Sequence, residues 1–198
     1  QCSFGQASGL VKSDEEFKRF YSFEEEMLDY FMEHPSANNP VDKNFAIFAS
    51  GNDSYHLAGY PAAHRDIISV SAFGPDFLPA VYTNYGPGNN IAAPGGDATI
   101  NMSAESDRAM ILSTVPSDCP AYDTDYGYMQ GTSMACPHVS GVVALGLSYA
   151  KKLGKSFTYD EFLAMLYSSV NNLDYYIETS RKKSNGIDFD LTPYWQAM

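Results

Sequence analysis

The sequence lacks any long apolar run and has few basic residues. Its longest apolar stretches, 44–49 and 142–147, are far shorter than the roughly 20 residues that a membrane-spanning helix needs. We therefore expect no membrane span. Lys and Arg total 12 against 24 Asp and Glu, which gives a formal net charge of -12. Because such a chain repels polyanions, we expect no nucleic-acid partner.

Cysteine is also scarce. Cys2, Cys119 and Cys136 do not have the spacing of a zinc site or a disulfide framework, and they allow at most one internal disulfide. The acidic residues of the 118–125 loop do not have EF-hand spacing, so we interpret them as solvated and predict no metal site from them. The chain begins at Gln1 without the basic-then-apolar pattern of a signal peptide, so we expect that an upstream portion has been removed.

What the sequence does have is apolar content of 44%, with 14% aromatic residues, enough for a sizeable core. No linker or repeat divides it, so we expect one domain over residues 1–198. A capping box at Ser13, followed by large apolar residues at helical spacing, predicts one amphipathic helix that ends before Pro35. A second capping box at Thr158 predicts a final helix, and the tail from 171 to 198 shows no strong period.

Two apolar runs with β-branched residues, 44–49 and 66–72, predict strands buried on both faces, as in a parallel sheet covered by helices. Further short strands are predicted at 80–85 and 110–115, between Gly, Pro and Asn residues typical of turns. From Thr132 to about Leu153 the sequence is apolar almost all round, which predicts a buried helix. The fold class is therefore α/β, with many loops.

The segment Gly131–Gly141, G-T-S-M-A-C-P-H-V-S-G, joins a Gly- and Tyr-rich loop to this helix. At the start of a buried helix, the hydroxyl of Ser133 lies near the positive end of the helix dipole and near unpaired main-chain N–H groups. Such donors stabilise a developing oxyanion. The alternative is that Thr132 or Ser133 merely caps the helix.

This segment resembles, almost letter for letter, the nucleophile motif of the subtilisin-like serine peptidases. The resemblance extends from about Ser3 to Val170 and implies a three-layer αβα fold with a mostly parallel sheet, incomplete at its N-terminal side. It also implies a serine endopeptidase that acts on protein or peptide substrates. Further blocks similar to those of the family occur in the same order: Ser50–Asp53, Tyr60–Ala62, Ile67–Val70, Tyr85–Gly88, Ala92–Gly95 and Ile111–Thr114.

The resemblance also implies roles for single residues. Ser133 takes the place of the nucleophile, and the side-chain amide of Asn52 joins the Ser133 N–H in the oxyanion hole. Two segments are similar to strands that bind an extended substrate through main-chain hydrogen bonds and wall its pocket. These substrate-binding residues are Ser3, Phe4 and Gly5 in the first segment and Ala49, Ser50 and Gly51 in the second.

A serine nucleophile needs a general base and an orienting carboxylate. The family's D-[ST]-G and H-G-T motifs for these residues are absent from the chain. His138 matches a structural histidine of the family, and His34, His56 and His64 are interpreted as surface or loop residues. Because the family's Asp and His precede the S-x-G strand, we expect the N-terminal portion of the same peptidase domain as a partner. Without it, we expect the chain to be nearly inactive.

The resemblance further implies export from the cell and allows a structural calcium ion, for which the sequence identifies no ligands. An α/β-hydrolase is excluded because its acid and histidine follow the serine, and only His138 follows Ser133. A sedolisin-type peptidase would carry Asp where Asn52 stands. A non-catalytic peptide-binding or regulatory module on the same fold stays open.

Overall fold

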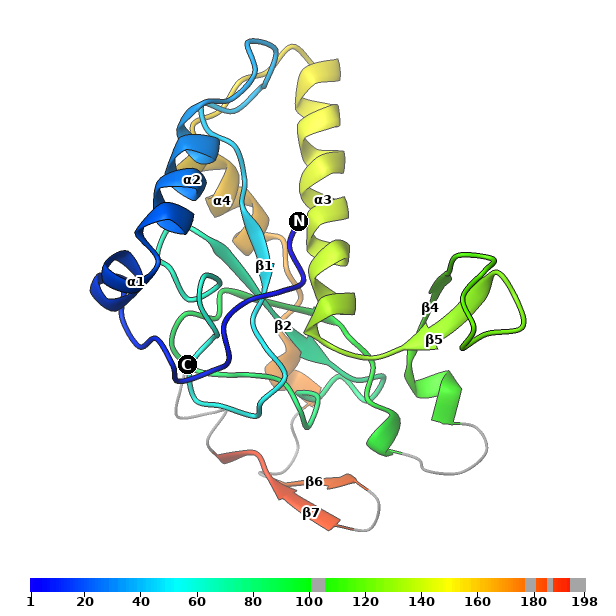
Figure 1. The fold of residues 1–198 in the computed structure, drawn as a ribbon. Coiled ribbons are helices and arrows are strands. Elements are labelled where there is room, and N and C mark those ends of the chain that lie inside the picture. The colour runs from blue at the N-terminus through cyan, green and yellow to red at the C-terminus, as the bar shows by residue number, and fades with distance from the viewer. Residues whose placement is uncertain (101–105, 177–180, 185–186, 193–198) are drawn as a thin grey trace.

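Figure 1 shows the computed structural model, which describes residues 1–100, 106–176, 181–184 and 187–192. Its centre is a sheet of β1 (Ile47–Ala49), β2 (Ile68–Phe73) and β3 (Ile91–Pro94), in that order. The strands are parallel, with Ala49 opposite Val70 and Val70 opposite Ile91. All of β1 and the first half of β2 are buried. The predicted parallel sheet is confirmed.

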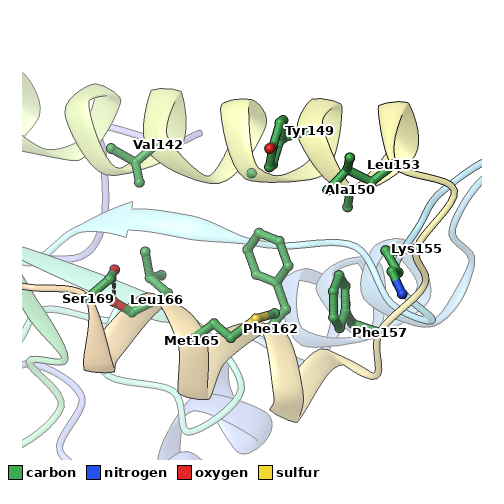
Figure 2. Close-up of a pocket in the computed structure, with 11 residues that line it drawn as sticks. Val142, Tyr149, Ala150, Leu153, Lys155, Phe157, Phe162, Met165, Leu166 and Ser169 are labelled. Atoms are coloured by element: carbon green, nitrogen blue, oxygen red, sulfur yellow. Dashed lines mark hydrogen bonds between the residues drawn. The ribbon is translucent and has the colours of Figure 1, made fainter.

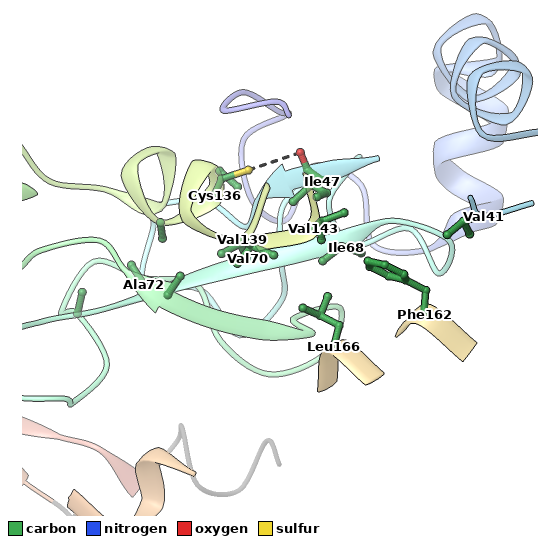
Figure 3. Packing of buried hydrophobic residues seen from close by; sticks show 14 residues of the cluster. Val41, Ile47, Ile68, Val70, Ala72, Cys136, Val139, Val143, Phe162 and Leu166 are labelled. Carbon is green, nitrogen blue, oxygen red and sulfur yellow. Dashed lines mark hydrogen bonds between the residues drawn. The ribbon is translucent and has the colours of Figure 1, made fainter. Parts of the chain in front are cut away.

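One face of this sheet packs against α3 (Thr132–Lys152) and α4 (Tyr159–Ser168). The strands contribute Ile47, Ile68 and Val70 to the buried cluster, α3 contributes Val139 and α4 contributes Phe162 (Figure 3). Because side chains alternate across a strand, the residues between them point to the opposite face. The apolar side chains on that opposite face must be buried by another element.

The opposite face is covered by α2 (Ser22–Glu33), whose Met32 packs in one cluster with Phe48 of β1. The prediction of a single helix here is wrong, because α1 (Asp14–Phe20) ends before Tyr21 and α2 begins after it. The break lets α1 bury Phe17 against Tyr60, at 5.3 Å between ring centroids, while α2 reaches β1. Helices on both faces of a parallel sheet make the three-layer α/β arrangement that the sequence predicts.

The two predicted capping boxes differ in the structure. At α4 both bonds are present: the Thr158 side chain accepts from the Glu161 N–H, and the Glu161 side chain accepts from the Thr158 N–H. At α1 the Ser13 hydroxyl accepts from the Glu16 N–H at 3.2 Å, but the Glu16 carboxylate accepts from the Lys12 N–H instead of the Ser13 N–H. The second box is confirmed and the first is formed only in half.

The segment 80–85 is not a strand, contrary to the prediction. The Thr83 N–H donates to the Ala80 carbonyl oxygen at 3.0 Å, which closes a turn that an extended strand does not contain. The predicted strand at 110–115 is confirmed as β4 (Ile111–Thr114), which pairs antiparallel with β5 (Tyr126–Met129). This hairpin projects from the body of the molecule (Figure 1).

The helix α3 was predicted to be buried all round, and this is wrong. Val142, Leu145 and Tyr149 are 53%, 72% and 62% exposed, because the sheet and α4 cover only the side that carries Val139 and Val143. Of the helices that the structure describes, α3 included, none combines the length and the apolar character that crossing a membrane requires.

The remaining elements are short. The 3-10 helices are η1 (Ala98–Ile100), η2 (Ser106–Ala109) and η3 (Leu173–Tyr176). In the tail, β6 (Arg181–Ser184) and β7 (Ile187–Asp190) form an antiparallel hairpin that the sequence analysis does not predict, because β6 is polar throughout and the alternation in β7 lasts only four residues. Residues 177–180, 185–186 and 193–198 of the tail lie outside the described residues.

Two glycines in α3 provide a matched test of the α3–α4 packing. A Cβ at Gly141 would meet nothing within 4 Å, whereas a Cβ at Gly146 would lie 2.8 Å from the Phe162 ring. Relative to Ala, Gly in a helix interior costs roughly 0.5–1 kcal/mol. We expect Gly141→Ala to raise the free energy of unfolding in urea by about 0.5–1 kcal/mol, and Gly146→Ala to raise it less or to lower it. An equal gain in both variants would contradict the packing of Phe162 against α3.

Candidate active site

Ser133 is the second residue of α3, and the residue immediately before this helix, Gly131, has an unusual backbone conformation. Gly131 stands at the N-cap with φ 146° and makes no side-chain cap, so neither Thr132 nor Ser133 caps the helix. A φ of this value disfavours any residue with a side chain. The alternative that this segment merely holds a helix-capping hydroxyl is therefore wrong.

The carbonyl group of Ser133 has a partner outside the helix. Pro137, four residues later in α3, has no N–H to donate to it. The hydroxyl of Ser3 donates to this carbonyl oxygen instead, at 3.0 Å. The Ser133 hydroxyl in turn points toward the Ser3 carbonyl oxygen, at 3.5 Å. These contacts bring the N-terminal segment beside the start of α3, as Figure 1 also shows.

Asn52 lies in the turn after β1 and contacts the same helix end. Its Oδ1 accepts hydrogen bonds from both the N–H and the hydroxyl of Thr132, each at 2.9 Å. The Thr132 hydroxyl also accepts from the Gly51 N–H at 3.3 Å. Because Oδ1 is held by Thr132, the Nδ2 group of Asn52 is turned away from Thr132 and stays available as a donor.

The donors of Asn52 and Ser133 border one small space. The point where a Cβ of residue 131 would stand is 3.6 Å from Asn52 Nδ2 and also 3.6 Å from the Ser133 nitrogen, while Asn52 Oδ1, which Thr132 engages, is 3.8 Å away. Gly131 leaves that space free. Two N–H donors that face one space can stabilise negative charge that develops on a carbonyl oxygen.

Gly95 and Tyr82 hold the loop that contains Gly131. The Gly131 N–H donates to the Gly95 carbonyl oxygen at 2.9 Å. The Tyr82 hydroxyl contacts the carbonyl oxygens of Gly95 and Gly96, at 2.9 and 2.6 Å. Burial raises the pKa of the Tyr82 hydroxyl well above its ordinary value, so this group stays a protonated donor even at alkaline pH, where an exposed tyrosine ionises.

The predicted substrate segment Ser3–Gly5 directly follows a residue, Cys2, that pairs with the edge of β1. Cys2 forms a parallel bridge with Phe48, with bonds of 2.8 Å to the Ile47 carbonyl and 3.0 Å from the Ala49 N–H. Ser3, Phe4 and Gly5 follow this bridge and are exposed. Within the described residues, no hydrogen bond engages the main-chain N–H and C=O groups of Phe4 and Gly5.

The second predicted substrate segment is built differently. Ala49 and Ser50 are buried, and the Ser50 carbonyl oxygen already accepts from the Gly59 N–H and from Asn84 Nδ2. The N–H and C=O groups of Gly51 are also bonded within the protein. The main chain at Ser50 and Gly51 is therefore not free to pair with another strand.

No histidine forms a hydrogen bond with Ser133 in the described part of the chain, which contains all four histidines. His138 Nδ1 lies 2.7 Å from the Met134 carbonyl oxygen, one turn earlier in α3. His34 makes the same contact with Tyr30 at the end of α2. His64 is a loop residue but is buried, 3.8 Å from the Glu25 carboxylate.

An apolar pocket of about 400 Å³ lies between α3 and α4 (Figure 2). Its lining includes Val142, Tyr149, Phe162 and Met165. None of the predicted catalytic or substrate-binding residues belongs to it. We therefore assign it no part in the candidate site.

Sequence reasoning missed two contributors to this site. Thr132 was considered only as a helix cap, although it orients the Asn52 amide. Tyr82 was placed in a strand that does not form, whereas its hydroxyl supports the loop below Gly131. Both contacts join residues that are far apart in the chain, so the sequence gives no local signal for Tyr82. For Thr132, the one available signal was its position directly before the serine.

A comparison with known families matches residues 2–189 to the model of the subtilase family. Halolysin of Haloferax mediterranei is 38% identical over 102 residues, which cover 52% of this chain and 16% of halolysin. The extracellular basic protease of Dichelobacter nodosus is 32% identical over 130 residues, covering 65% of this chain and 19% of that protein. The chain therefore spans only a small part of the length of these curated relatives.

Solved structures give the same fold. A crystal structure of a lanthipeptide protease aligns with 81% of this chain and 50% of its own, with a TM-score of 0.63 and 19% identity. A protease structure from Pseudoalteromonas arctica PAMC 21717 covers 78% of this chain and 43% of its own, with a TM-score of 0.53 and 30% identity. The first likeness concerns the fold alone.

The support of the Gly131 loop by Tyr82 is testable through its pH dependence. Tyr82→Phe removes a buried donor from two carbonyl groups, so we expect it to lower the free energy of unfolding at pH 7 by about 1–3 kcal/mol. Above about pH 10 an unfolded tyrosine ionises while the folded Tyr82 stays protonated. The advantage of the wild type should then shrink by up to about 1.4 kcal/mol per pH unit. Urea unfolding of both proteins from pH 7 to 11 measures this, and a constant difference would contradict it.

Proposed function

The chain belongs to the subtilase family, and from this premise we propose that it is the nucleophile-bearing part of a serine endopeptidase that cleaves peptide bonds through an acyl-enzyme on Ser133. The observation that carries the proposal is the pair of donors beside Gly131. Asn52 Nδ2 and the Ser133 nitrogen each lie 3.6 Å from the point where a Cβ of residue 131 would stand.

In the proposed reaction, Ser133 Oγ attacks the substrate carbonyl carbon and its proton passes to a histidine. The carbonyl oxygen becomes an oxyanion, which accepts hydrogen bonds from Asn52 Nδ2 and the Ser133 N–H. The C–N bond then breaks as the histidine protonates the leaving amine, and the substrate stays bound as an ester of Ser133. Water activated by the same histidine hydrolyses the ester and restores the free serine.

The histidine and its aspartate come, in this proposal, from a segment outside the 198 residues. Among the described residues, the Ser133 hydroxyl has one hydrogen-bond partner, the Ser3 carbonyl oxygen, and a carbonyl oxygen is too weak a base to take its proton. Loss of the base removes roughly 10⁶-fold of turnover in enzymes of this type. We therefore propose that the chain alone is nearly inactive.

The free main-chain groups of Phe4 and Gly5 suit a protein or peptide substrate in an extended conformation. Such a substrate would add a strand to the edge that begins at Cys2, through main-chain hydrogen bonds. The segment Ala49–Gly51 would wall the pocket of the residue before the cleaved bond. Two of the relatives are named an extracellular basic protease and an extracellular protease, so we propose an extracellular location.

A structural calcium ion plays no part in the proposal. Nowhere in 1–100, 106–176, 181–184 or 187–192 do three or more His, Cys, Asp or Glu residues gather in a way that could hold a metal ion. The acidic loop 118–125 offers no such group either. The described residues therefore do not fit a calcium site built from such side chains.

A fluorophosphonate probe tests whether Ser133 is an activated nucleophile. In the full-length protein, we expect Ser133 Oγ to displace the fluoride and to form an adduct that mass spectrometry locates on the peptide containing Ser133. The isolated 198-residue chain should react far more slowly, because it lacks the base. Ser133→Ala is the control for labelling elsewhere. No adduct in a folded, mature full-length protein would favour the non-catalytic peptide-binding or regulatory module.

The role of Asn52 is tested by Asn52→Ala in the full-length protein. Removal of one oxyanion donor lowers kcat by about 10²–10³, and KM should change little because the interaction forms in the transition state. Asn39→Ala is a matched control, since the Asn39 side-chain amide donates to the Lys43 carbonyl oxygen, in a loop after α2, and has no hydrogen bond to Asn52 or to α3 in the described part of the chain. Peptide hydrolysis with a chromogenic substrate measures both parameters. An unchanged kcat in Asn52→Ala would remove this residue from the mechanism.

A further inference from the structure

Asn84 is a fully buried polar residue for which neither the family motif nor the proposed reaction has a role. Its side chain forms four hydrogen bonds, which saturate it. Oδ1 accepts from the Asp53 N–H at 3.0 Å and the Tyr55 N–H at 3.1 Å. Nδ2 donates to the Ser50 carbonyl oxygen at 2.8 Å and to the Ser8 hydroxyl at 2.6 Å.

The main-chain partners of Asn84 lie on both sides of Asn52. Besides the side-chain bonds, the Asn84 N–H donates to the Gly51 carbonyl oxygen at 3.1 Å. The residues immediately before and after Asn52 are therefore both bonded to Asn84. A Cβ on Gly51, which has φ 110°, would clash with Asn84 Nδ2, so the close approach of the two residues requires glycine at this position.

The neighbours of Asn84 reinforce the same turn. The Ser54 N–H donates to the Tyr82 carbonyl oxygen at 2.9 Å, and the Tyr85 N–H donates to the Tyr55 carbonyl oxygen at 3.0 Å. Ser8 links the N-terminal segment to this network, because its hydroxyl donates to the Asp53 carboxylate at 2.6 Å. The segment 81–85 thus holds the turn 50–55 along its length, with Asn84 at the centre.

We propose that Asn84 is the positioning residue for Asn52, because it fixes the turn from which the Asn52 amide reaches the oxyanion. This inference rests on the proposed function of Asn52. Asn52 itself is exposed, and Thr132 holds only one end of its side chain. The main chain on either side of Asn52, at residues 51 and 53, is held by Asn84. Asn84 does not touch the substrate, and it acts through Asn52 alone.

A double-mutant cycle in the full-length protein tests this inference. A misplacement of about 1 Å in a catalytic group costs up to about 10²-fold in rate. We therefore expect Asn84→Ser to lower kcat by about 10- to 100-fold, with KM within about twofold. In the Asn52→Ala background the same change should have no further effect on kcat, because there is no amide left to position.

Asn90→Ala is the matched control. The Asn90 side chain also accepts a main-chain N–H, that of Ser69 at 2.7 Å, but it has no hydrogen bond to the turn 50–55. We expect it to lower stability without a loss of kcat. Ser8→Ala is a milder second variant, which removes the two bonds of the Ser8 hydroxyl, to Asn84 Nδ2 and to the Asp53 carboxylate, and leaves the Asn84 amide in place. It should lower kcat in the same direction by a smaller factor, and it keeps the test possible if Asn84→Ser does not fold.

The outcomes separate this inference from the proposed function. Equal losses of kcat from Asn84→Ser with and without the Asn52 amide would overturn the positioning role, as would no loss at all. A wild-type protein that neither hydrolyses peptides nor reacts at Ser133 would overturn the proposed function instead. In that case, hydrogen exchange at the Asp53 and Tyr55 amides still decides whether Asn84 holds the turn. Faster exchange in Asn84→Ser supports it, and unchanged exchange overturns it.

Discussion

The hydrogen bonds between Asn52 and Thr132 join the two parts of the chain that carry the chemistry. Asn52 follows β1, and Thr132 opens α3 about eighty residues later. The Thr132 N–H and hydroxyl both bind Oδ1, so the amide can present only Nδ2 to the space beside Gly131. If this contact were lost, the position of Asn52, the proposed oxyanion donor, would no longer be fixed relative to Ser133.

The parallel sheet makes this contact possible. Parallel strands bring their carboxyl ends to the same edge, and sites in such folds gather there. The chain leaves β1 toward Asn52 and leaves β3 toward Gly95, and Gly95 binds Gly131. Because α3 packs on the three strands through its buried side, its first turn is carried to that same edge.

Buried polar groups then hold the loops that regular structure does not reach. Asn84 is fully buried and saturated by four side-chain hydrogen bonds, and Tyr82 bonds two carbonyl groups below the Gly131 loop. A buried polar group that loses its partner is costly, which makes each of these contacts specific for one loop conformation. Residues 81–85 belong to the predicted strand 80–85, but in the structure they form a loop that supports the site.

Local signals in the sequence determined the elements whose stabilising contacts are near in the chain. The capping box at Thr158, the apolar runs of β1 and β2 and the start of α3 at Thr132 were all predicted, since periodicity and capping act within a few residues. The nucleophile segment was recognised as a resemblance, which the subtilase family match over residues 2–189 supports.

Only the tertiary structure decided what depends on contacts between distant segments. The break at Tyr21 arises because Phe17 and Met32 pack against different parts of the core. Which side of α3 is exposed depends on the elements that pack against the helix. The apolar sequence of α3 itself does not specify these elements. The orientation of the Asn52 amide requires Thr132 and the turn around it requires Asn84, and these contacts form only when β1, α3 and the loop at 84 are brought together by the folded sheet.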